Sequence, residues 1–154
     1  LWSFEELNIK KRTAHLKANC IGCFMLNGHD NIAFPSHTKS EDFCQFLMDV
    51  RRYNPLNRIC LVLDNFATHK AKKVKEKASE LNITLIYLPP YSPDLNPIEY
   101  LWKSIKRIIS ISSIESTDEL LQIVRDSFFG MTASLSSARM WIPRFLYDKL
   151  NMLC

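Results

Sequence analysis

Two carboxylates are candidates for chemistry because of where the surrounding sequence places them. Asp64 follows Ile59–Leu63, a short apolar run that predicts a strand buried on both faces. Glu99 follows Asn96 and Pro97, which are typical of an N-cap and a first helical residue. Carboxylates at a strand end and a helix start could hold a divalent cation. Position alone favours an ordinary structural explanation, because the helix macrodipole itself favours Glu in a first turn.

The elements that must position these carboxylates are predicted from apolar patterns. A second apolar run, Ile83–Leu88, predicts another buried strand, and the following Pro89-Pro90 pair ends it because proline cannot continue a ladder. A helix is expected to open at Thr68, between the two strands. The prolines of the loop 89–97 stiffen that connection, which would fix the direction of Glu99. The helix predicted over 97–110 carries a broad apolar stripe of Ile98, Leu101, Trp102, Ile105, Ile108 and Ile109.

Three further elements are expected on either side of this central stretch. Apolar runs at 18–26 and 32–34 flank the turn sequence Asn27-Gly28 and predict a β-hairpin. An apolar stripe from Phe43 to Val50 predicts a helix over 40–52. The capping box Ser116–Glu119 opens a last helix, which Gly130 can end. This order of hairpin, helix, strand, helix, strand and helix predicts an α/β fold with helices on the faces of one sheet.

The sequence around both carboxylates resembles one known family. Asp64-Asn65-x-x-x-His69 is followed by Leu88-Pro-Pro-Tyr-Ser-Pro-Asp-Leu-Asn-Pro-Ile-Glu99, and thirty-four residues lie between Asp64 and Glu99. These motifs and this interval are similar to those of DDE transposases of the mariner-like and related bacterial insertion-sequence families. The resemblance covers most of the chain. It implies a ribonuclease H-like fold, which is a mixed sheet with helices on both faces.

The resemblance also implies a set of metal ligands. In this family two Asp and one Glu hold two divalent metal ions, so Asp64 and Glu99 are expected to be catalytic residues that bind Mg²⁺ or Mn²⁺. Trp2 looks like a Trp that follows the family's first Asp by a short interval. The first Asp is therefore expected upstream of Leu1, with the first strand of the fold truncated or missing. Because two carboxylates without a third hold metals weakly, we expect this chain to cleave DNA poorly or not at all.

Supporting and DNA-binding residues are expected around the two carboxylates. Asn65, His69 and Asn96 are predicted to support the site. His69 could be a helix-start residue with no chemical task, or it could orient substrate or a metal-bound water. Asp30 and Asp94 are interpreted as turn residues. The residues expected to contact DNA are Lys70, Lys73, Lys103, Lys106 and Arg107, although the lysines after His69 could simply be a solvated face and Glu99 could form an ordinary i,i+4 pair with Lys103.

The overall composition excludes several classes of protein. A chain of 154 residues with 47% hydrophobic residues predicts one globular domain over 1–154. No apolar run approaches the roughly 20 residues that span a bilayer, so no membrane partner is expected. The net charge of +4 is a mild bias towards polyanions. The basic run over residues 10–17, in a polar segment 1–16, is either a solvated loop or a contact with DNA phosphates.

The cysteines indicate a reducing compartment. They are five in number and lie mainly in apolar runs, which predicts reduced thiols in a cytoplasm. The resemblance to DNA transposases implies in addition a nucleoid-associated protein. Cys20 and Cys23 have a spacing found in zinc and redox sites. No second Cys or His pair completes such a site, so buried strand cysteines are the favoured interpretation.

Two functions from different classes follow from these observations. The first is a transposase catalytic domain that cleaves and transfers DNA strands, with transposon ends and target DNA as partners and a homodimer as a possible assembly. No helix-turn-helix segment is found in the sequence, so sequence-specific end recognition is not expected of this chain. The second is a non-catalytic DNA-binding remnant or domesticated module, and an upstream Asp would separate the two. A ribonuclease H-type nuclease that is not a transposase is disfavoured by the Pro-Pro-Tyr-Ser-Pro loop.

Overall fold

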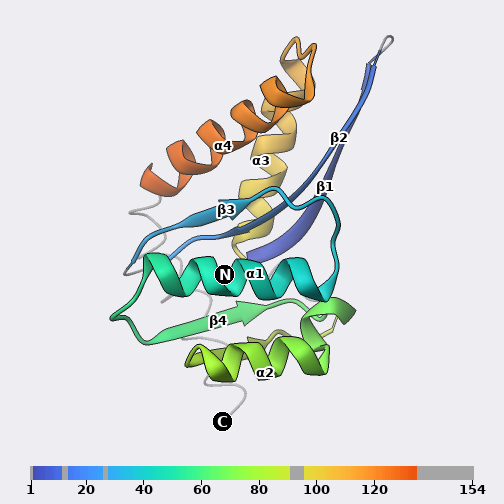
Figure 1. The fold of residues 1–154 in the computed structure, drawn as a ribbon. Coiled ribbons are helices and arrows are strands. Elements are labelled where there is room, and N and C mark those ends of the chain that lie inside the picture. The colour runs from blue at the N-terminus through green and yellow to red at the C-terminus, as the bar shows by residue number, and fades with distance from the viewer. Residues whose placement is uncertain (1, 12–13, 26–27, 91–95, 135–154) are drawn as a thin grey trace.

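The computed structural model describes residues 2–11, 14–25, 28–90 and 96–134, with side chains described from residue 16 onward. Within these residues the sheet has five strands in the order β3-β2-β1-β4-β5 (Figure 1). Neighbouring strands β1, β2 and β3 are antiparallel, whereas β1 and β5 are both parallel to β4. The expectation of a mixed sheet is confirmed. The strands are β1 (Trp2–Lys11), β2 (Ala14–Cys23), β3 (Asn31–Ala33), β4 (Ile59–Leu63) and β5 (Ile83–Tyr87).

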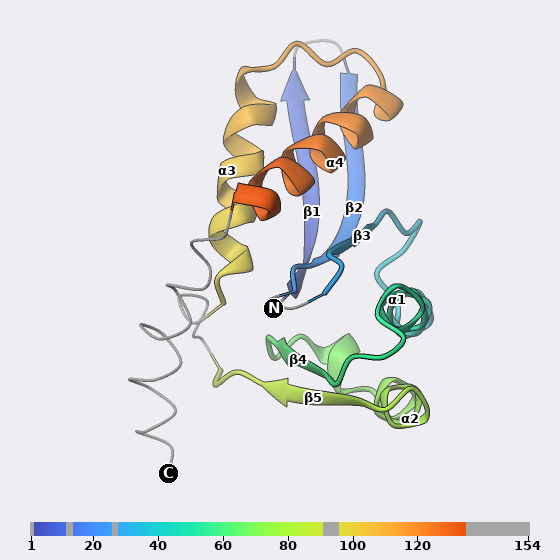
Figure 2. The same cartoon turned by 90° about the vertical axis from the view of Figure 1, so that its left-hand side faces the viewer.

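Helices cover both faces of this sheet. Helices α1 (Ser40–Tyr53) and α2 (Lys72–Glu80) pack against each other on one side, and α2 contacts β5. On the other side α3 (Ile98–Ile111) contacts β1 and α4 (Thr117–Ser134) contacts β2, as Figure 2 shows. Helices on both faces are therefore confirmed. Within the described residues, no helix is both long enough and apolar enough to cross a bilayer.

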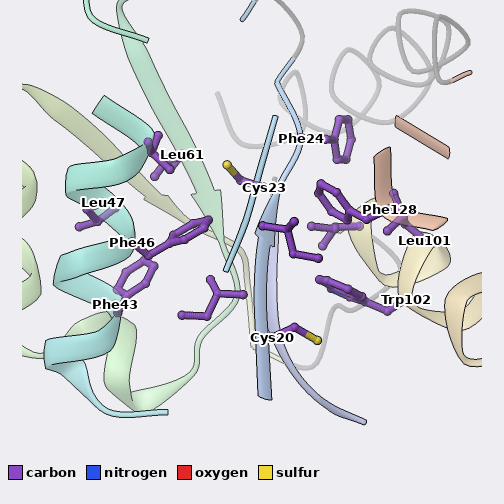
Figure 3. Close-up of a cluster of buried hydrophobic side chains, with 14 of the residues drawn as sticks. Cys20, Cys23, Phe24, Phe43, Phe46, Leu47, Leu61, Leu101, Trp102 and Phe128 are labelled. Atoms are coloured by element: carbon purple, nitrogen blue, oxygen red, sulfur yellow. The ribbon is translucent and has the colours of Figure 1, made fainter. Parts of the chain in front are cut away.

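The hydrophobic core has one half on each face of β2 (Figure 3). Cys23 lies on the side of Phe43 and Phe46 from α1, and Cys20 lies on the side of Trp102 from α3. Residues three apart in a strand point to opposite faces, so these two thiols cannot share a metal ion or form a redox pair with each other. Burial raises the pKa of Cys23 to about 12. The interpretation as buried strand cysteines is confirmed.

Several predicted elements appear where the sequence patterns placed them. Strand β4 has the predicted bounds, and β5 is one residue shorter than expected. Helix α1 begins at the predicted Ser40, but the Ser40 side chain does not cap it; the backbone N–H of Lys39 donates to Asp42 Oδ2 at 3.0 Å instead. The capping box of α4 is present, since the Glu119 backbone N–H donates to Ser116 Oγ at 3.1 Å. The hairpin expected near Gly28 is the β2–β3 pair.

The N-terminal segment differs from its prediction. Residues 2–11 form β1, a ten-residue strand paired along its whole length with β2, instead of a polar loop. Apolar and polar residues alternate over Leu7-Asn8-Ile9-Lys10, which is the period of a strand and was obscured by the charge of the run. Residues 2–11 therefore provide the strand at the centre of the sheet, so that strand is not missing.

Three local predictions are wrong for identifiable reasons. The helix expected from Thr68 is a short 3₁₀ turn over Ala67–Lys70, followed by α2 only after Ala71, whose ψ of 140° breaks the helical path. Strand β4 is not buried on both faces, since Cys60 is exposed and Val62 half-buried. Helix α4 continues through Gly130 to Ser134, because one exposed glycine weakens a helix without ending it.

Candidate active site

Asp64 stands where three strands of the sheet meet. It directly follows Leu63, the last residue of β4, and Leu63 is the partner of Trp2 in β1. On the other side, the Leu88 backbone N–H donates to the Leu63 carbonyl at 2.7 Å, and the Asn65 side-chain amide donates to the Leu88 carbonyl. Asn65 therefore ties the end of β4 to the start of the loop after β5. These contacts fix the backbone from which the Asp64 carboxylate projects.

The two oxygens of the Asp64 carboxylate have different surroundings. Oδ1 accepts a hydrogen bond from the Phe66 backbone N–H at 3.0 Å and lies 2.7 Å from Nδ1 of His69. Within the described part of the chain, no donor contacts Oδ2, and the side chain is 39% exposed. One oxygen is held by the protein, and the other is not engaged by the described residues. That is a suitable arrangement for a monodentate metal ligand.

The same contacts keep Asp64 ionised. Burial by itself would raise the pKa of this carboxyl, but the hydrogen bonds from His69 and from the Phe66 backbone N–H outweigh burial and leave the pKa below its ordinary value. Asp64 is thus negatively charged at neutral pH. A charged oxygen ligand is what Mg²⁺ and Mn²⁺ require.

His69 is a buried member of the site. Its exposed fraction is 0%, and its ring lies between Phe43, at 4.9 Å between ring centroids, and Phe66, at 5.5 Å. Its carbonyl accepts a hydrogen bond from the Tyr87 hydroxyl at 2.9 Å. The roles of Phe43 and Tyr87 were not predicted, because the apolar stripe of α1 and the pattern of β5 identify them only as packing residues.

Glu99 lies in the first turn of α3, where its backbone N–H donates to the Asn96 carbonyl at 3.0 Å. The expected side-chain N-cap by Asn96 is not observed; Pro97 occupies the cap position and Asn96 is buried. Buried Ile98, Leu101 and Trp102 anchor the helix. Figures 1 and 2 show the start of α3 beside the beginning of β1, whose Trp2 pairs with the residue before Asp64. The start of the helix that carries Glu99 therefore lies near the strand that pairs with the end of β4.

A group of three potential metal ligands is not assembled among the described residues. Asp94 falls in the segment 91–95, outside the described residues. Asp30 is a turn residue as predicted, since its Oδ1 accepts a hydrogen bond from the Met25 backbone N–H at 2.7 Å.

The predicted DNA-binding residues lie in three elements: α3, the 3₁₀ turn Ala67–Lys70 and α2. Lys103, Lys106 and Arg107 are exposed on α3, with the Lys103 ammonium 5.2 Å from the centroid of the Tyr100 ring. Lys70 is exposed at the end of the 3₁₀ turn that contains His69. Lys73 differs, because its ammonium is 2.9 Å from Glu41, and this hydrogen bond lowers the pKa of Glu41 to about 2.

Comparisons with known proteins identify the family. Residues 5–121 match the family described as DDE superfamily endonuclease, and the chain belongs to that family. Its fold is ribonuclease H-like, since it is similar to the catalytic domain of Mos1 mariner transposase, with a TM-score of 0.66 at 20% identity over 82% of this chain and 68% of that one. A Mos1 paired-end complex with left transposon end gives a TM-score of 0.67 at 17% identity, over 82% of this chain and 46% of that one.

A curated relative supports the same family. The transposable element Tcb2 transposase of Caenorhabditis briggsae is 43% identical over 44 residues, which are 29% of this chain and 16% of that protein. The matched stretch thus spans about one sixth of the relative's own length. The Mos1 catalytic domain has been solved with Mn and with Mg.

Proposed function

We propose that this chain is the catalytic domain of a mariner-type transposase, in which Asp64 and Glu99 hold divalent metal ions for cleavage and transfer of DNA strands. The observation that carries the proposal is the partly exposed Asp64 carboxylate at the end of β4, kept ionised by His69 and the Phe66 backbone N–H through one of its two oxygens. Its family membership and the Mos1 structures with Mn and Mg support this use of the site.

The donor set fits Mg²⁺ or Mn²⁺. Both ions prefer oxygen ligands, and both candidate side chains are carboxylates. When bound, two such ions activate the attacking hydroxyl group and neutralise the leaving oxygen of a phosphodiester. The residues of this chain position those ions: β4 fixes Asp64, and the anchored apolar stripe of α3 fixes the helix that carries Glu99. A third carboxylate, expected from an Asp that precedes Trp2, would complete the set.

The exposed cations of α3 give the proposed DNA path. Lys103 and Lys106 follow Glu99 at the spacing of successive helical turns, so a phosphate backbone entering at Glu99 would meet them in sequence. Arg107 extends this row, and Lys70 lies next to the buried His69. Phosphate contacts of this kind bind DNA without reading its sequence. Transposon ends and target DNA are the proposed substrates, and a homodimer stays a prediction.

Nicking of supercoiled plasmid in Mn²⁺ tests the proposal. Five proteins are compared: residues 1–154, the same chain with Glu99→Gln, a version extended by the coding residues that precede Leu1, and that extended version with Glu99→Gln or with Glu76→Gln. Glu76→Gln, which changes an exposed acid of α2, is the matched control. We expect nicking only by the extended protein and its Glu76→Gln variant. Nicking by an extended protein that carries Glu99→Gln, at an undiminished rate, would exclude Glu99 from the site. An extended protein that binds DNA but never cuts favours the non-catalytic DNA-binding module.

A further inference from the structure

We infer that His69 is a positioning residue, whose buried imidazole holds Oδ1 of Asp64 so that Oδ2 alone is presented to the metal. The inference rests on the proposed function, because it assigns a task to His69 within that site. In this assignment His69 touches neither substrate nor metal itself.

Burial decides how His69 can act. With an exposed fraction of 0%, the side chain offers no surface to a DNA strand or to a water in an open site. Asp64, in contrast, is 39% exposed and is 2.7 Å away through Nδ1 and Oδ1. We therefore assign the effect of His69 on a bound metal to its contact with Asp64.

The contacts of Oδ1 leave one geometry for the carboxylate. The Phe66 backbone N–H and His69 Nδ1 approach the same oxygen, at 3.0 Å and 2.7 Å. An oxygen with two such neighbours has its acceptor capacity filled, so rotating the carboxylate would break both contacts. Oδ2 is then the oxygen left for a cation, and its position is set before any cation arrives.

His69 is itself held through both its ring and its backbone, by residues of α1, of the segment before the 3₁₀ turn and of β5. Phe43 of α1 and Phe66 pack against its ring, at 4.9 Å and 5.5 Å. Its backbone N–H donates to the Phe66 carbonyl at 3.0 Å, and its carbonyl accepts from the Tyr87 hydroxyl of β5 at 2.9 Å. Partners that orient a metal ligand in this way typically change metal affinity about 10- to 100-fold when they are removed.

Three substitutions of His69 separate positioning from packing. In His69→Asn the side-chain amide can place a donor near the position of Nδ1. His69→Gln carries the same amide further out, and His69→Phe fills the space between the two phenylalanines without a donor. His37→Asn, at a histidine outside the site, is the control. The readout is the Mn²⁺ dissociation constant of residues 1–154, measured by electron paramagnetic resonance of free Mn²⁺, with circular dichroism to verify folding.

We expect His69→Asn and His37→Asn to bind Mn²⁺ within about threefold of the unsubstituted chain, and His69→Gln and His69→Phe to bind about tenfold or more weakly. In an Asp64→Asn background, His69→Phe should cause no further loss. A folded His69→Phe or His69→Gln with unchanged affinity overturns the inference. So does a folded His69→Asn that is as weak as His69→Phe.

A measurement on the unsubstituted chain covers the case in which a variant does not fold. With ¹⁵N-labelled histidine, Nδ1 of His69 should carry a proton, and its resonance should move at the same Mg²⁺ concentrations as the Asp64 carboxyl carbon. The inference is overturned if Nδ1 of His69 carries no proton. It is also overturned if the Nδ1 resonance stays unchanged while the Asp64 carboxyl resonance moves with Mg²⁺. Either result leaves the proposed function standing. If Asp64 does not respond and Asp64→Asn leaves Mn²⁺ affinity unchanged, the metal site of the proposed function is wrong and the inference falls with it.

Discussion

Nδ1 of His69 lies 2.7 Å from Oδ1 of Asp64, and the histidine is fully buried while the carboxylate is 39% exposed. The pair joins the end of β4 to a 3₁₀ turn five residues later. This explains the Asp-Asn-x-x-x-His motif. The 3₁₀ turn Ala67–Lys70 turns the chain back, so the side chain of His69 lies against the carboxylate of Asp64.

The lowered pKa of Asp64 predicts a pH-dependent contribution to stability. A folded-state pKa below the unfolded value of about 3.9 stabilises the protein above that value, and the contribution is lost as pH falls through the folded-state pKa. The difference in unfolding free energy between the unsubstituted chain and Asp64→Asn should therefore shrink below about pH 4. We expect it to be no more than about 1 kcal/mol, because the side chain is partly exposed. Urea unfolding at pH 6, 4 and 3 measures it, and a pH-independent difference contradicts the account.

Gly22 is predicted to be required for packing between β2 and the helices on its face. A Cβ added there would lie 2.8 Å from Cε2 of Phe128 and 3.0 Å from Cζ2 of Trp102, both buried rings. Gly22→Ala should destabilise the chain by about 1–3 kcal/mol, measured by urea unfolding. Gly130→Ala is the matched control, since a Cβ there meets nothing within 4 Å and alanine favours a helix by about 0.5–1 kcal/mol. Equal stability of Gly22→Ala and the unsubstituted chain would show that the two rings can move apart.

The basic residues should contribute unequally to DNA binding. Lys103→Ala and Lys106→Ala are each expected to reduce the slope of log affinity against log salt by about 1, as for a lost phosphate contact. Lys73→Ala should have a smaller effect, because Glu41 lies 2.9 Å from that ammonium. In a Glu41→Gln background the effect of Lys73→Ala should increase. Fluorescence anisotropy of a labelled duplex between about 50 and 200 mM salt provides the test, and equal slopes for all variants contradict a DNA path along α3.

Thiol reactivity should follow burial. Burial raises the pKa of Cys23 to about 12, whereas Cys60 is exposed on β4. The thiolate is the reactive form, so iodoacetamide at pH 8 should modify Cys60 and spare Cys20, Cys23 and Cys44 in the folded chain. Peptide mass spectrometry locates the modified residues, and the same reaction in denaturant is the control. Modification of Cys23 as fast as Cys60 in the folded chain contradicts the packing of β2.

Sequence patterns predicted much of this fold because its helices and central strands have strong periodicity. The bounds of β4, the start of α1 and the capping box of α4 needed only local information. The strand β1 was missed because its alternation over Leu7–Lys10 is short and lies in a charged segment, and because its stability comes from pairing with β2. The exposed Cys60 was missed for a related reason, since an apolar run does not show which face of a sheet is left uncovered.

The candidate site was predicted in its residues but not in its contacts. The motif identified Asp64, His69 and Glu99, and the resemblance gave them expected roles. Only the fold shows that His69 is buried, that Oδ1 of Asp64 is the oxygen it approaches, and that Lys73 is engaged by Glu41. These facts depend on how α1 and β5 pack around the 3₁₀ turn, and sequence spacing carries no information about that packing.

The central claim is that Asp64 and Glu99 belong to one metal site. Titration of residues 1–154 with Mn²⁺, followed by paramagnetic broadening of side-chain carboxyl resonances, tests it most directly. We predict that the signals of Asp64 and Glu99 broaden together at the same Mn²⁺ concentration, while that of Glu76 on α2 stays sharp. Broadening of only one of the two, or of Glu76 to the same extent, would contradict the claim.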